Sequence, residues 1–164
     1  MADNEYTEYV TAALPWLRRT AYLLCGDVHS ADDVVQVAIT RLYTNWRKAR
    51  AADNLDAYVR AILVRTFLNE RRRPWSRVRL FDRVDELKAV TNPASETTDF
   101  ETREEIRVAL TRMPPGQRAV LVLRFLFDLP VAEVARALRC SEGTVKSQTS
   151  AGLASLRTQL GVTK

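Results

Sequence analysis

The stretch that decides the fold is LPVAEVARALRCSEGTVKS, residues 129–147. Its pattern predicts a short helix that begins near Pro130, a brief turn at 139–140, and a second helix capped by Ser141. The small Ala135 allows the two helices to cross closely. The inward-facing positions of the first helix are Val131, Val134, Ala135 and Leu138. The pattern is typical of a helix-turn-helix. A hairpin that only packs a core is the alternative, which the short polar tip and the capped second helix disfavour.

The second helix of this motif carries polar side chains near its N-terminus. Such a helix enters the major groove of duplex DNA, where polar side chains meet base edges and the positive end of the helix dipole lies near phosphate. Lys146 is the only Lys or Arg between Arg139 and Arg157. We expect the DNA-facing residues to be Thr144, Lys146, Ser147, Gln148 and Ser150.

The rest of the chain is predicted to be helical as well. Apolar residues return at three- and four-residue steps over 4–24, 30–46, 54–73, 80–90, 99–112, 115–127, 131–138 and 142–160. Ser30 is the expected cap of the second helix, with Asp33 three residues on. The polar, turn-prone residues 91–98 predict a flexible linker. The sequence therefore predicts an all-α protein with two helical domains, 1–90 and 99–164, joined by that linker.

Composition and cysteine spacing limit the classes of function. The net charge is +5, and over residues 58–83 eight Arg stand against two acidic residues, which indicates a nucleic-acid-binding surface. Cys25 and Cys140 lie far apart and His29 is the only His, so we expect neither a disulfide framework nor a metal site. Both cysteines are expected in the core, and no cofactor is expected.

Membrane, secreted and enzymatic classes are disfavoured. No apolar run approaches the roughly 18 residues that a membrane span needs. The acidic start, residues 1–5, lacks the basic and apolar segments of a secretory signal, so we expect a cytoplasmic protein. The chain has no Gly-rich phosphate loop and no nucleophile elbow, so we do not expect an enzyme.

Two motifs resemble conserved regions of the extracytoplasmic-function sigma factors of the sigma-70 family. SEGTVKS, residues 141–147, preceded by MPPGQRAVLVLRF, residues 113–125, resembles their fourth region, most of all in a short actinobacterial group of the sigma-E type. ADDVVQ, residues 31–36, with RLY at 41–43 and Trp46, resembles their second region, the helix that docks on the clamp helices of the largest RNA polymerase subunit. The resemblance spans about residues 14–160, with both motifs in the family order.

The resemblance implies an RNA polymerase sigma factor that binds core polymerase and recognises the −35 and −10 promoter elements. Core polymerase would contact Asp33, Gln36 and Arg41. Single-stranded downstream promoter DNA would contact Asn54, Tyr58, Arg60, Arg65, Arg71 and Arg72. The loop at about 51–56 would receive a flipped base, and Phe67 is expected in the core. The upstream duplex would contact the helix-turn-helix residues named above. An anti-sigma factor is a further expected partner, and no membrane is.

Four positions depart from the family pattern. Val37 stands where relatives usually carry Glu, and Arg65 where they often carry Asn. Gln148 and Ala151 stand where relatives commonly have Arg, so two cationic DNA contacts are missing and upstream binding should be weak. Two alternatives therefore stay open: a degenerate sigma-like protein that binds polymerase without starting transcription, and a stand-alone helix-turn-helix regulator. The second leaves the first domain unexplained.

Overall fold

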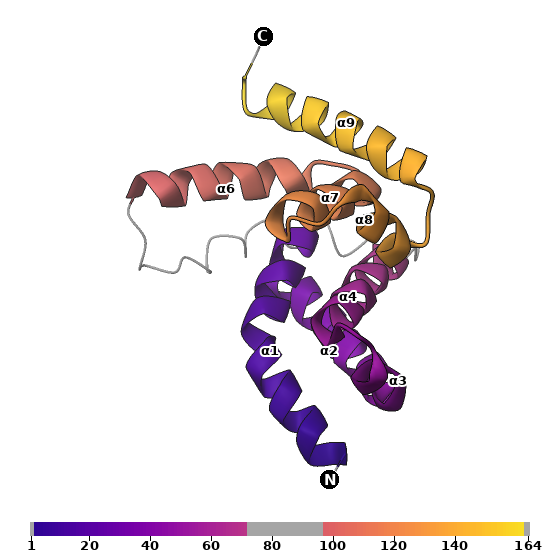
Figure 1. Cartoon of the computed structure of the whole chain (residues 1–164). Helices are drawn as coiled ribbons and strands as arrows, with labels where there is room; N and C mark the ends of the chain where they lie inside the picture. Colours follow the sequence, from indigo (N-terminus) through magenta and orange to yellow (C-terminus); the bar gives the residue numbers. More distant parts are fainter. Residues whose placement is uncertain (1, 72–96, 163–164) are drawn as a thin grey trace.

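The computed structural model describes residues 2–71 and 97–162, with side chains from 101 onward in the second range; we call these ranges the first half and the second half. Both are helical and neither contains a strand, which confirms the all-α prediction (Figure 1). The first half holds α1 (Ala2–Cys25), α2 (Val28–Thr44), α3 (Trp46–Ala51) and α4 (Leu55–Arg71). The second half holds α6 (Thr97–Thr111), α7 (Pro115–Leu121), the π-helical η2 (Val122–Leu126), α8 (Val131–Leu138) and α9 (Glu142–Gln159).

Helix α2 begins earlier than predicted because Asp27, and not Ser30, is its N-cap. Oδ1 of Asp27 accepts a hydrogen bond from the backbone N–H of Ser30 at 2.8 Å, which places Ser30 inside the first turn. The predicted Ser30 cap is therefore wrong. Trp46 belongs to α3 rather than to α2, since α2 ends at Thr44 and Asn45 is its C-cap.

The helix-turn-helix forms as its sequence predicts. Ser141 caps α9, and its Oγ accepts a hydrogen bond from the backbone N–H of Thr144 at 3.0 Å. Pro130 is the N-cap of α8, one position before the helix starts. Arg139 ends α8 in the left-handed conformation, with φ of 56°, and this turns the chain towards α9.

The helix predicted over 115–127 is not continuous. After α7 the chain widens into η2, because the N–H of Phe127 donates to the carbonyl of Val122, five residues back, at 3.3 Å. The predicted helix at 80–90, Arg72 and linker residues 91–96 lie outside the described residues. Helix α6 begins at Thr97, two positions before the expected start.

The two halves pack against each other around one apolar cluster (Figure 1). Helix α1 packs along α2 and α4, and it also contacts α6 and α7; α4 in turn contacts α7 and α8. Phe67 is fully buried, which confirms its predicted place in the core. The largest fully buried side chains come from both halves and include Leu17, Leu24, Leu42, Leu63, Phe67, Val120, Leu123, Val134 and Val145.

The cysteines differ in burial. Cys25 lies in the core, as predicted, and Cys140 is only half-buried at the turn before α9; both are free thiols. Within the described ranges, no group of His, Cys, Asp and Glu is arranged to hold a metal ion. Across those same residues, no helix is both long and apolar enough to cross a membrane.

Candidate nucleic-acid interface

Helix α9 presents most of its predicted DNA-facing residues to solvent. Val145 is fully buried, and Gly152 lies so close to α7 that an added Cβ would be 3.1 Å from the side chain of Leu121. These two contacts determine which side of α9 faces the core. Thr144, Lys146, Ser147 and Ser150 are exposed, and Gln148 is half-buried.

The exposed turn of α9 is mostly neutral and polar. The Ser147 hydroxyl donates to the carbonyl of Thr144 at 3.0 Å, and the Oγ atoms of Ser141 and Thr144 lie 2.9 Å apart. The Lys146 ammonium adds one positive charge beside the positive end of the helix dipole. The exposed Glu142 in the first turn adds one negative charge. The hydroxyl groups can hydrogen-bond to base edges, and Lys146 can contact one phosphate group.

The three residues expected to bind polymerase do not share one surface. Asp33 and Gln36 are both exposed on α2, and their three-residue spacing places them on one side of the helix. Arg41 is half-buried, and its guanidinium donates to Oγ1 of Thr66 on α4 at 3.4 Å. The structure therefore groups Asp33 with Gln36 and places Arg41 against α4.

The downstream-DNA residues of α4 contact the second half of the chain. The guanidinium of Arg60 lies over the ring of Phe127, 4.5 Å from its centroid, and Phe127 also packs edge-on against Trp16. Asn54 is exposed, but its Oδ1 accepts a hydrogen bond from the N–H of Ala57 at 3.0 Å and so caps α4. Arg60 is thus covered and Asn54 has a structural role.

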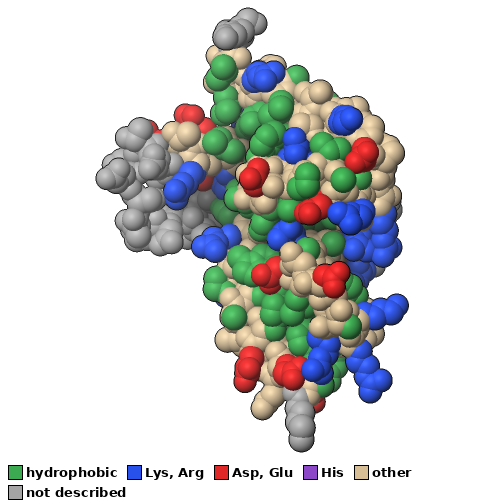
Figure 2. All heavy atoms as spheres, viewed as in Figure 1, with side chains coloured by type: hydrophobic (Ala, Val, Ile, Leu, Met, Phe, Trp, Pro, Cys, Tyr) green, Lys and Arg blue, Asp and Glu red, His purple; other side chains and the backbone are tan. Residues whose placement is uncertain are grey.

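An open pocket of about 340 Å³ lies beside α4, lined by residues of α2, α3 and α4, and Arg139 from the turn before α9 completes its lining. Its lining residues are Arg41, Asn45, Lys48, Tyr58, Ile62, Arg65, Asn69 and Arg139. Burial and then the nearby charge of Arg139 lower the pKa of Arg65. Figure 2 shows Lys and Arg side chains gathered on the side where α4 and α8 lie in Figure 1.

Sequence reasoning missed Lys48 and Arg139 as members of this group. Lys48 follows Arg41 by seven residues, which is about two helical turns. This spacing favours a place on the same side of the helical segment, although α2 and α3 are separate helices. Nothing local predicts that Arg139 meets Arg65, because the two residues belong to different halves.

Three arginines converge on the C-terminal end of α1. Arg71 donates to the carbonyl of Cys25 at 2.8 Å, Arg107 to that of Gly26 at 3.0 Å, and Arg118 to that of Leu24. Unpaired carbonyls give a helix C-terminus partial negative charge, which attracts cations. Arg71 comes from the first half and the other two from the second half, so this end of α1 joins the halves.

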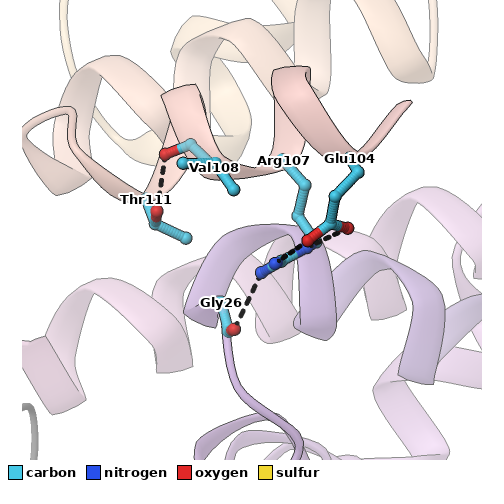
Figure 3. Close-up of polar contacts among 5 residues, drawn as sticks. All are labelled: Gly26, Glu104, Arg107, Val108 and Thr111. Atoms are coloured by element: carbon cyan, nitrogen blue, oxygen red, sulfur yellow. Dashed lines mark hydrogen bonds and ion pairs between the residues drawn. The ribbon is translucent and has the colours of Figure 1, made fainter. Parts of the chain in front are cut away.

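The buried arginines are held by further partners. Arg107 forms an ion pair with Glu104 on the same helix while it reaches Gly26, as Figure 3 shows. Arg118 also donates to the carbonyls of Met113, at 2.8 Å, and Thr111, at 3.0 Å. Burial, followed by the charge of Arg71, lowers the pKa of Arg118 to about 10. At this end of α1 the guanidinium groups therefore donate mainly to backbone carbonyls.

Comparison with known proteins identifies both halves. Residues 9–77 match the family described as sigma-70 region 2, and residues 103–156 match sigma-70, region 4. The RNA polymerase sigma-E factor of Streptomyces coelicolor is 33% identical over 157 residues, which cover 95% of this chain and 86% of that protein. The ECF RNA polymerase sigma factor EcfG of Rhodopseudomonas palustris is 30% identical over 86% of this chain and 77% of its own length.

A solved structure shares the fold. The sigma factor RpoE of Bartonella quintana, in complex with the anti-sigma factor NepR, matches with a TM-score of 0.74 at 23% identity, over 98% of this chain and 99% of that one. The two sigma-70 regions occur in the order that the sequence motifs predict, and the relatives align along almost the whole chain. The chain therefore belongs to the sigma-70 family, among the extracytoplasmic-function sigma factors.

Proposed function

We propose that this chain directs promoter-specific initiation of transcription as a subunit of RNA polymerase. The observation that carries the proposal is the pair of sigma regions, of which the first presents Asp33 and Gln36 and the second presents the capped helix α9. The chain acts in the cytoplasm and supplies no catalytic group of its own. The polymerase performs the chemistry and the sigma subunit selects the start site.

Core polymerase binds the exposed side of α2. Asp33 offers a carboxylate and Gln36 an amide, which together suit a basic partner helix. Val37, where relatives usually carry Glu, is half-buried, so the contact depends more on the other two residues. We assign Arg41 to the α4 side of the first half instead.

Promoter DNA binds both halves. Helix α9 enters the major groove at the upstream element, and the base-edge contacts come from its exposed hydroxyl groups and Lys146. Helix α4 and the loop before it hold the melted downstream strand. Because Arg60 lies against Phe127 of the second half, the halves must separate before α4 can hold that strand.

An anti-sigma factor is a proposed partner as well. The support is the similar solved structure, in which a sigma factor of this fold is bound to NepR. We also keep 1–90 and 99–164 as the proposed domains, each with its own binding task.

Run-off transcription tests the proposal. Core polymerase, this chain and a genomic promoter library should give transcripts from a defined set of promoters, and core polymerase alone should not. Polymerase binding without transcripts would favour the degenerate alternative. Tight and sequence-specific binding of free protein to duplex DNA, measured by mobility shift, would favour the stand-alone regulator.

A further inference from the structure

The pocket between the halves has the composition of an anion site. Arg41, Lys48 and Arg65 reach it from the first half and Arg139 from the second, while none of the described residues that line it is acidic. We propose that this pocket binds a small phosphate-bearing anion, such as pyrophosphate or a nucleotide phosphate group, which links the two halves. Tyr58 and Arg65 of this pocket are also proposed downstream-DNA contacts, but a small anion bound here while the halves are packed is a separate ligand.

Among the described residues that line the pocket, none brings a charge of opposite sign to these cations. Burial and then the charge of Arg139 lower the pKa of Arg65, and because Arg65 is half-buried, solvent screens the repulsion between the two guanidinium groups incompletely. A bound anion would offset this repulsion, because it would attract Arg65 of the first half and Arg139 of the second half at the same time. An anion in this pocket therefore gains more binding free energy than it would on an exposed basic surface.

Hydrogen bonds within the protein hold three of these cationic residues in place. Arg41 is held to Thr66 by the contact at 3.4 Å, and Nε of Arg65 donates to the carbonyl of Ala61 at 3.3 Å. The N–H of Arg139 donates to the carbonyl of Arg136 at 3.3 Å. Each guanidinium keeps further N–H donors for a ligand, since Arg carries five.

The chemistry of the lining favours phosphate over a carboxylate. Guanidinium groups form bidentate hydrogen bonds with either anion. One carboxylate, however, carries a single negative charge, whereas the pocket holds four cationic side chains. A phosphate or pyrophosphate group carries more charge and more acceptor oxygens. The neutral donors at the rim are the Asn45 and Asn69 amides and the Tyr58 hydroxyl.

Isothermal titration of the full chain with pyrophosphate tests the site, at an ionic strength held constant with chloride. Arg65→Gln and Arg139→Gln should each weaken binding by about tenfold, the usual effect of losing one charge-assisted contact. Arg136→Gln, exposed on α8 and outside the pocket, is the matched control and should bind like the parent. Lys48→Gln, exposed on α3, provides a third variant if Arg65→Gln unfolds.

A second titration with a short oligo-dT strand separates a free anion from DNA phosphate. Arg65→Gln should weaken both ligands, and Arg139→Gln should weaken pyrophosphate alone, because Arg139 meets α4 only while the halves are packed. The proposal fails if pyrophosphate binds no better than chloride, or if the pocket variants bind it like the parent. Equal losses of both ligands in Arg139→Gln would assign the pocket to the DNA backbone instead. No polymerase is present, so the result is independent of transcription.

Discussion

The two surfaces proposed to bind DNA differ in what covers them. On α9, Thr144, Lys146 and Ser147 are exposed, and the helix packs on its own half through Val145 and Gly152. On α4, by contrast, Arg60 lies against Phe127 of the second half, and Arg65 shares a pocket with Arg139 of that half. The chain as it stands can therefore offer its upstream surface to DNA, but it cannot offer its complete downstream surface.

The cause of this difference lies at the end of α1. Arg107 and Arg118 of the second half satisfy carbonyls there, and α7 and α8 of that half pack against α4. The covering of α4 is thus fixed by contacts that themselves involve none of the predicted DNA-facing residues of α9. Changes at this end of α1 should affect the downstream surface and leave the upstream one intact.

The largest expected effect concerns a third surface, the exposed side of α2, which resembles α9 in being uncovered. Asp33→Arg combined with Gln36→Ala should abolish capture of core polymerase, because the change reverses a charge and removes an amide from the contact. Pull-down of core polymerase measures this. Glu101→Arg, an exposed acid on α6, is the control and should bind as the parent does. Unchanged capture by the double variant would contradict the assignment.

Removing the Arg118 contacts should uncover α4. Arg118→Met should lower the free energy of unfolding by about 3 kcal/mol, because it leaves buried carbonyls without a donor. Binding of single-stranded downstream promoter DNA by the free protein should rise at the same time. Urea denaturation and fluorescence anisotropy measure the two effects. Arg112→Met, exposed in the turn between α6 and α7, should change neither. An Arg118→Met protein with parental stability would show that Arg118 does not hold the halves together.

A smaller effect is expected from Gly26→Ala. Gly26 has φ of +84°, and its added Cβ would clash with Cγ2 of Thr111 on α6. We expect a loss of about 2 kcal/mol in the free energy of unfolding, from backbone strain and the clash together. Gly161→Ala, with φ of +70° and open space around it, isolates the strain. Adding Thr111→Ser should restore part of the loss, and no recovery would show that α6 does not pack there.

Lys146→Ala tests the uncovered surface. It should weaken upstream binding by about 1 to 2 kcal/mol in the holoenzyme, because no other cation lies on the exposed turn of the recognition helix. If the ammonium contacts phosphate alone, the loss is equal on all promoters and the salt slope falls by about one. Transcription at several salt concentrations decides between phosphate and base contact. Parental rates throughout would leave Lys146 without a DNA role.

The smallest effect is a pH dependence at the end of α1. Burial raises the pKa of the Cys25 thiol to about 12 from 9.0, so the unfolded chain loses this proton first as pH rises. The unfolded state is then favoured, and stability should fall by about 1 kcal/mol between pH 8.5 and 10. Above pH 10 the lowered pKa of Arg118 acts in the opposite direction. Urea denaturation at both pH values should show a larger fall in the parent than in Cys25→Ala, in which the raised pKa values of Tyr6, Tyr9 and Tyr22 still give part of the fall.

Local signals predicted the helix-turn-helix well. The signals are local, because each residue affects only the backbone or packing near it in the chain. The bounds of α8 and the cap of α9 followed from Pro130, Ala135 and Ser141. The burial of Phe67 was predicted for the same reason, from the periodicity of one helix. By contrast, the widening of the chain at η2 has no signal in the spacing of apolar residues, which suits a regular helix equally well.

The packing of the halves could not be predicted from the sequence. Arg118 and the carbonyl that it reaches on α1 are 94 residues apart, and Arg107 and Gly26 are 81 apart. Spacing patterns report on neighbours within one helix, and they carry no information about such distant partners. This is why Arg60 and Arg71 were predicted as free DNA contacts and were instead found against other parts of the chain.

The shared core also affects folding during synthesis, because the first half is made before the second half that packs against it. A ribosome releases α1 and α4 well before it makes α7, so Trp16 lacks its partner Phe127, and Phe67 lacks Arg118, until the second half emerges. A nascent first half therefore exposes apolar surface that the finished chain hides. We expect a fragment ending after α4 to be less soluble than the whole chain, and the two halves to unfold together in one cooperative transition.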